Sequence, residues 1–202
     1  QLTSAPFLLL CLFFATQTAI CNFNTCTQKD FLLELGDTDH KYLSIFTLLT
    51  PVSVIGAPFM DYTILRFGWS VALQCINVLA AAFLTVKIAS TSLDVQIVGF
   101  VIFSFYRSFL FGVSFSFLPS LVAETVVGRA CGIIVALAGV GGLLLIPLIQ
   151  LVVGNDGVDF FVPNVIMLSL CIPTTMAICF LSPYIWMERE TKAEQEEAED
   201  SK

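Results

Sequence analysis

The fold of this chain is decided by residues 94–124, which read DVQIVGFVIFSFYRSFLFGVSFSFLPSLVAE. Between Asp94 and Glu124 the only charged residue is Arg107, so the run is long and apolar enough to cross a bilayer as one helix. At roughly 1.5 Å of rise per residue, Arg107 stands about 20 Å from Asp94 and about 26 Å from Glu124. A cation at that depth costs about 2.5–3.5 kcal/mol to insert. We therefore expect Arg107 to have a partner.

Water in a cavity, backbone carbonyls, a part of the protein outside this sequence, or a ligand carboxylate would each serve Arg107 as partner. No Asp or Glu elsewhere in the chain lies at comparable depth. Helical spacing places Ser104, Phe111 and Ser114 on the same face as Arg107. This face suits a small solute with a carboxylate and an apolar body, because guanidinium binds carboxylate through two parallel hydrogen bonds. Structural, ligand-binding and gating roles for Arg107 all remain open.

Composition places the chain among integral membrane proteins. Hydrophobic residues make up 57% of it and charged residues 12%, which is about half the charged share of a soluble domain. We predict an all-α membrane domain over residues 1–187 with six transmembrane helices. The six apolar runs lie at about residues 5–25, 41–60, 69–88, 94–118, 130–153 and 162–187. The chain opens at Gln1, close to the start of an apolar run, and we expect it to be part of a longer protein.

Residues 188–202 form an acidic tail with seven acidic and three basic residues, which we expect to be solvated. Six spans put both ends of the membrane domain on one side. Basic residues slightly favour the side of the tail: Arg66, Arg129, Arg189 and Lys192 against Lys29, Lys41 and Lys87. This excess predicts a cytoplasmic tail, and we expect a multi-pass protein of the plasma membrane. The charge pattern contains no basic patch for nucleic acid.

The first span carries amides that hydrocarbon cannot satisfy. Gln17, Asn22 and Asn24 each need a hydrogen-bond partner there. They are therefore predicted to line a solute path or to bond to neighbouring helices, and their spacing does not separate the two.

Glycines are concentrated in the fifth span, among them Gly132, Gly139 and Gly142. Small residues in membrane helices allow close helix packing, and they also allow helices to slide during gating. Both interpretations remain open and are compatible.

Signatures of an enzyme are missing from the sequence. The single histidine, His40, lies in a polar stretch where a solvated side chain is expected, and the cysteines show no metal-binding spacing. We therefore expect no catalytic residue, no metal and no cofactor. Cys21 and Cys26 flank the start of the expected first loop, residues 26–40, and could form a disulfide bond if that loop lies outside the cell.

Three stretches resemble a known family. Residues 106–112 read YRSFLFG, residues 132–138 read GIIVALA, and residues 160–167 read FFVPNVIM. They are similar to the last three spans of solute carrier family 43, the large neutral amino acid transporters of the major facilitator superfamily. The resemblance runs over nearly the whole chain and corresponds to the C-terminal six-helix half of a twelve-helix carrier.

The resemblance implies that the chain works with a missing N-terminal six-helix half. The two halves would rock around a central site and move large neutral amino acids. In such a half the first, second, fourth and fifth spans line the cavity and the third and sixth face lipid. Gln17, Asn22, Asn24 and Arg107 fall on cavity-lining spans under this scheme.

One motif departs from the superfamily pattern. The link between the second and third spans usually reads Gly-x-x-x-Asp-Arg-x-Gly, and the matching positions here are Asp61, Leu65, Arg66 and Gly68. Arg66 resembles a residue that locks helices on the cytoplasmic side, with Asp61 as a candidate substitute for its missing partner. The altered link also leaves open a second interpretation, a receptor or scaffold relative that keeps the fold but does not transport.

Overall fold

The structure is a computed structural model that describes residues 2, 4–153 and 160–183. This part of the chain is helical and has no strand. The α-helices are α1 (Ala5–Glu34), α2 (Lys41–Leu49), α3 (Gly56–Phe67), α4 (Trp69–Ala89), α5 (Leu93–Leu121), α6 (Val127–Leu144), α7 (Ile146–Val153) and α8 (Phe161–Ser169), with 3₁₀ turns η1 (Thr50–Ile55) and η2 (Glu124–Val126). A further helical stretch follows α8 at residues 171–183.

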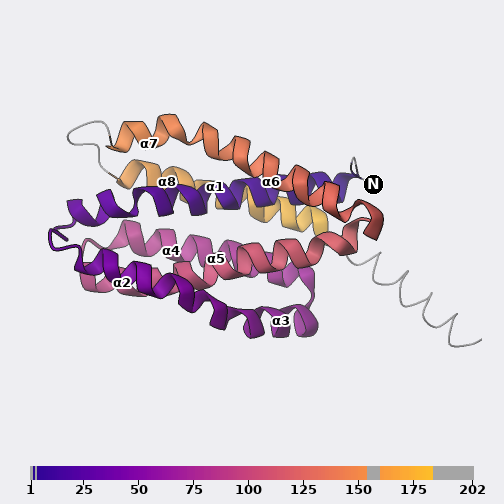
Figure 1. Cartoon of the computed structure of the whole chain (residues 1–202), viewed down its shortest axis with the longest axis horizontal. Coiled ribbons are helices and arrows are strands. Elements are labelled where there is room, and N and C mark those ends of the chain that lie inside the picture. Colours follow the sequence, from indigo (N-terminus) through magenta and orange to yellow (C-terminus); the bar gives the residue numbers. More distant parts are fainter. Residues whose placement is uncertain (1, 3, 154–159, 184–202) are drawn as a thin grey trace, which may run out of the picture.

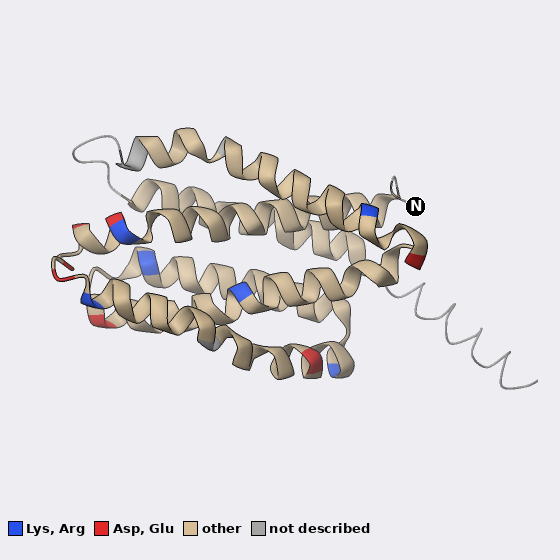
Figure 2. Cartoon of the chain, in the orientation of Figure 1, with Lys and Arg blue, Asp and Glu red and all other residues tan. Residues whose placement is uncertain are grey.

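The helices lie side by side along one direction and form a bundle (Figure 1). Six helical segments of the described chain are long and apolar enough to cross a membrane: Ala5–Glu34, Lys41–Phe67, Trp69–Ala89, Leu93–Leu121, Glu124–Gln150 and Phe161–Pro183. Acidic and basic residues gather toward the two ends of the bundle, and the zone between them is almost free of charge (Figure 2). This distribution fits a hydrocarbon layer, and the chain is a multi-pass membrane protein by these criteria. The acidic tail lies outside the described residues.

The first helix is longer than predicted. Residues 26–34 continue α1, whereas the first span was predicted to end near residue 25. Two polar side chains there are nevertheless buried: the hydroxyl of Thr27 donates to the carbonyl of Phe23 at 2.8 Å, and the amide oxygen of Gln28 accepts a bond from Lys87. Polarity was therefore a wrong guide to where this helix ends.

The second span is a broken helix. Pro51 lacks the N–H that an α-helix needs, and the chain changes from α2 to the 3₁₀ turn η1 at this point before continuing as α3. The expected charged connection at 61–68 is wrong, because α3 extends to Phe67 and includes Asp61 and Arg66. The turn into α4 is made by Gly68 alone, at φ 87°, a left-handed conformation that favours glycine.

The fifth and sixth spans are also interrupted close to prolines. The fifth divides at Leu145 into α6 and α7, two residues before Pro147. The sixth divides at Leu170 into α8 and residues 171–183, three residues before Pro173. Such breaks persist in membranes when neighbouring groups satisfy the freed backbone.

Helix packing follows a twofold pattern. The first span packs on the fifth (α1 on α6 and α7), and the fourth packs on the second (α5 on α2, η1 and α3). The third packs on the fourth (α4 on α5), and the first meets the sixth through Gln17 and Thr174. When spans one, two and three are exchanged with spans four, five and six, the first–fifth pair becomes the fourth–second pair. The third–fourth pair becomes the sixth–first contact, which is made through Gln17 and Thr174.

Phenylalanine side chains fill the centre of the α2–α4–α5 contact. The ring of Phe46 packs against Phe100 and Phe103 at centroid distances of 5.3 and 5.5 Å, and Phe83 packs against Phe103 at 4.9 Å. These edge-to-face and tilted contacts fix α5 against its neighbours, because lipid supplies no hydrophobic force between helices and close packing must do so.

Candidate functional site

Arg107 lies near the middle of α5 and is partly exposed. Its guanidinium is within electrostatic reach of the Cys21 sulphur, which places it beside α1. Among the described residues it has no hydrogen-bond or ion-pair partner. A half-buried guanidinium at this depth, with all its donors free, remains open to a group from outside the described chain.

Aromatic rings lie one and two turns along α5 from Arg107. Phe111, which was predicted on this face, packs edge-on against Phe14 of α1 at 5.9 Å and stacks with Phe115 at 6.4 Å. Phe14 is fully buried and the other two rings are partly exposed. The face therefore joins a guanidinium to an apolar, aromatic surface.

The two serines predicted with Arg107 differ from each other. The Ser104 hydroxyl donates to the carbonyls of Leu49 at 3.0 Å and Phe100 at 2.9 Å. Leu49 ends α2, so Ser104 satisfies backbone at the break in the second span, and its assignment as a cavity-lining residue is corrected. Ser114 is buried, and its hydroxyl has no hydrogen-bond partner among the described residues.

Gln17 is buried in helix packing and does not line an opening. Its amide nitrogen donates to Asn77 at 2.8 Å and to Thr174 at 3.4 Å, while the Tyr106 hydroxyl donates to its carbonyl and side-chain oxygens at 2.6 and 2.9 Å. Asn77 in turn donates to the carbonyl of Cys171 at 2.9 Å and to the hydroxyl of Thr175. We call these residues, Gln17, Asn77, Tyr106, Thr174 and Thr175, the Gln17 cluster. It joins α1, α4, α5 and residues 171–183.

The other two amides of the predicted stripe lie on different faces of α1. Asn22 is exposed, and Asn24 is fully buried with its amide nitrogen bonded to the carbonyl of Ile20 at 2.9 Å. Of the two roles predicted for Asn24, the structure shows a bond to a neighbouring helix and not a cavity lining: its remaining oxygen accepts a bond from Lys87 of α4.

Lys87 is the site residue that the sequence analysis missed, since it was counted as a flanking charge of the third span. Lys87 is 4% exposed, and its ammonium donates to Asn24 at 3.0 Å and to Gln28 at 3.4 Å. It also lies over the ring of Phe31 at 4.1 Å and near that of Phe83 at 5.6 Å. We call these residues, Asn24, Gln28, Phe31, Phe83 and Lys87, the Lys87 cluster. Lys87 lies two residues before the end of α4, and this position suggested a charge at the membrane surface.

The residues predicted to gate do not pair. Asp61 and Arg66 are both exposed on α3, and within the described ranges neither forms an ion pair, so Asp61 does not replace the missing motif aspartate in this conformation. Cys21 and Cys26 are free thiols. They lie five residues apart on α1, so their side chains are on different faces of one helix. This geometry excludes a disulfide bond between them in this structure.

Close helix packing uses different glycines from those predicted. A Cβ built on Gly132, Gly139 or Gly142 meets no atom within 4 Å in the described structure, so these glycines contact no neighbour. A Cβ on Gly112 would overlap the sulphur of Met60, and one on Gly56 would lie 3.2 Å from Phe105. These close approaches are between α3 and α5, and a Cβ on Gly99 of α5 would lie 3.3 Å from Val86 of α4.

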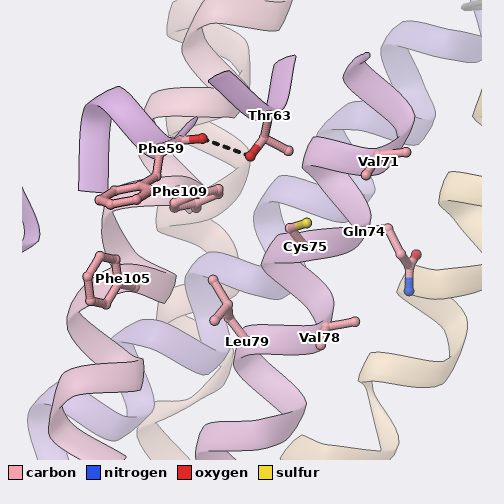
Figure 3. A pocket seen from close by; sticks show the side chains of 9 residues that line it. All are labelled: Phe59, Thr63, Val71, Gln74, Cys75, Val78, Leu79, Phe105 and Phe109. Carbon is pink, nitrogen blue, oxygen red and sulfur yellow. Dashed lines mark hydrogen bonds between the residues drawn. The ribbon is translucent and has the colours of Figure 1, made fainter. Parts of the chain in front are cut away.

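Two grooves flank α4. The first, of about 550 Å³, lies between α3, α4 and α5. Figure 3 shows the side chains around it, among them three phenylalanines. The lining residues are Phe59, Thr63, Val71, Gln74, Cys75, Val78, Leu79, Phe105 and Phe109. The second, of about 480 Å³, lies between α4 and the sixth span and shares Gln74 and Val78 with the first. Arg107 borders neither groove, so neither is the solute site expected around it.

Comparison with known proteins adds no relative: no family model, no curated protein and no solved structure matches this chain. The likeness to solute carrier family 43 therefore depends on the motif residues alone.

Proposed function

We propose that this chain is one six-helix half of a secondary transporter that carries a small amino-acid-like solute by alternating access. The observation that carries the proposal is Arg107, a partly exposed guanidinium in the middle of a membrane helix with no partner among the described residues. The resemblance to solute carrier family 43 narrows the proposed solutes to large neutral amino acids.

Two features of the fold support this proposal. Helix pairs that persist when the first and last three spans are exchanged are typical of transporters built from inverted repeats, since three spans per repeat reverse its direction in the membrane. Interrupted helices are the second feature, and they occur in the second, fifth and sixth spans. Transporters commonly build their solute paths from such discontinuous helices.

In the proposed mechanism Arg107 binds the carboxylate of the solute through paired hydrogen bonds. The apolar body of the solute then packs on the rings of Phe111 and Phe115. A second six-helix half closes the other side of the site, because binding sites of this class lie between two halves. The second and fifth spans, which are the least covered in the bundle, are proposed to contact that half.

The test is counterflow of labelled leucine and phenylalanine in proteoliposomes that contain the full-length protein. Charged hydrogen bonds contribute about 1.5–3 kcal/mol, so we expect Arg107→Ala to reduce exchange roughly 10- to 100-fold. Arg107→Lys keeps the charge but loses the paired geometry and should recover part of that loss. Arg129→Ala, at an exposed arginine of α6, is the matched control and should leave exchange unchanged.

Unchanged exchange in folded Arg107 variants would show that this residue does not hold the solute. Saturable binding of amino acids without exchange in the unmodified protein would instead favour the receptor or scaffold interpretation. Loss of folding is checked separately by the elution profile and thermal unfolding of each variant in detergent.

A further inference from the structure

The Lys87 cluster contains more buried donors than acceptors. An ammonium has three N–H groups, and two of them are directed to Asn24 and Gln28. The amide nitrogen of Gln28 adds two more N–H groups, and it is buried with no hydrogen-bond partner among the described residues. An acceptor is therefore the missing chemical group.

Charge leads to the same conclusion. Lys87 is 4% exposed, and no carboxylate in the described ranges forms an ion pair with it. The rings of Phe31 and Phe83 stabilise a cation but do not neutralise it. A buried charge without a counter-ion is strongly destabilising, so a negatively charged acceptor fits this position best.

We propose that a small monovalent anion, chloride, binds between the Lys87 ammonium and the Gln28 amide nitrogen at the contact of α1 and α4. The amide oxygen of Gln28 lies 3.4 Å from the Lys87 ammonium, and the amide nitrogen belongs to the same planar group, so the two donors are close together. Asn24, Gln28 and Lys87 are at most 4% exposed, and this enclosure suits a halide better than the carboxylate of a bulky solute. The proposal does not depend on transport.

The experiment measures thermal unfolding of the purified full-length protein in detergent while chloride replaces gluconate at constant ionic strength. For a site half filled near ~10 mM, raising chloride from ~1 to ~150 mM should increase Tm by about 2 °C in a twelve-helix protein. Bromide should act like chloride. This test contains no amino acid and measures Tm, whereas the transporter test measures amino acid exchange. Each proposal can therefore fail without the other.

Two variants assign the effect to these residues. Lys87→Met removes the charge and keeps the length of the side chain, and it should fold, because replacing a buried ion by an apolar group is often tolerated. Gln28→Met removes the second donor. Both should abolish the chloride dependence of Tm, whereas Lys41→Met, at an exposed lysine, should retain the full shift.

An unmodified protein whose Tm is indifferent to chloride overturns the proposal. Asp156 and Asp159 lie outside the described residues, and Asp159→Asn and Asp156→Asn test an internal carboxylate. If either variant gains a chloride dependence that the unmodified protein lacks, the counter-ion is that carboxylate. Stabilisation by acetate or leucine but not by chloride, lost in Lys87→Met, likewise overturns the halide and assigns the site to a carboxylate from solution.

Discussion

The Gln17 cluster and the Lys87 cluster both join α1 to α4, and they solve the problem of buried polarity in opposite ways. In the Gln17 cluster every member is neutral, and Gln17 and Asn77 use their donors and acceptors on each other, on Tyr106 and on residues 171–183. In the Lys87 cluster the central group is a cation, and the amide nitrogen of Gln28 has no acceptor among the described residues.

The difference shows which buried polar groups hold a fold together and which suit a ligand. A fully satisfied neutral network fixes one arrangement of helices, since any displacement would leave partners unsatisfied. A charged cluster with surplus donors is stabilised when a hydrogen-bond acceptor from outside the cluster binds to it. By this criterion Arg107 and Lys87 are the positions to test for ligands, and Gln17 is a position to test for stability.

The largest effect is expected from Asn77→Leu, which removes the centre of the Gln17 cluster. The substitution leaves the amide of Gln17 and the hydroxyl of Thr174 without a shared partner. A loss of about 2–4 kcal/mol in the free energy of unfolding should follow, measured by reversible unfolding in mixed micelles. The control is Leu79→Met, at a half-buried groove residue, which should cost under ~1.5 kcal/mol. A cost below that of the control would contradict a structural role for the cluster.

A smaller effect should separate the two rings around Lys87. Phe31 lies closer to the ammonium than Phe83 does, at 4.1 against 5.6 Å. In double-mutant cycles with Lys87→Met, the coupling of Phe31→Leu should be about 1–2 kcal/mol and should exceed that of Phe83→Leu. Equal couplings, or none, would mean that the rings pack against the stem of the lysine without stabilising its charge.

The smallest effect is expected from Thr174→Val, which deletes one hydroxyl at the edge of the Gln17 cluster. That hydroxyl also donates to carbonyls of its own helix, at 2.9 and 3.2 Å, so its contact with Asn77 is one of several. Polar contacts between membrane helices average about 0.6 kcal/mol, and a loss near that value should be measured in the same unfolding assay. A loss as large as that of Asn77→Leu would show that the threonine, and not the asparagine, is the centre.

The six spans could be predicted from the sequence because they depend on local properties. Hydropathy and length identify a membrane helix without knowledge of its neighbours, and all six predicted spans correspond to helical segments. Breaks in the second, fifth and sixth spans do lie close to prolines 51, 147 and 173, where a backbone N–H is missing. Pro119, however, lies inside α5 without breaking it, so a proline alone does not locate a break. The ends of α1 and α3 were missed for a related reason: Thr27, Gln28 and Asp61 are polar, and polarity does not end a helix whose backbone bonds are made internally.

The candidate site was less predictable. The depth of Arg107 followed from its position between Asp94 and Glu124, but its partial exposure depends on how α1 and α5 pack. Gln17, Asn22 and Asn24 looked alike in sequence, yet one belongs to a satisfied network, one is exposed and one binds a lysine. Lys87 was hidden because its partners lie about 60 residues away on α1.

By itself the sequence determined that this chain is a bundle of membrane helices with one cation at mid-depth, because these properties depend on hydropathy and position along the chain. The tertiary structure alone decided which polar side chains are satisfied, which glycines meet a neighbour, and that Lys87 is enclosed by amides and rings of α1. Those outcomes depend on the rotation of each helix about its axis, and that rotation is set by packing between segments that are far apart in the chain.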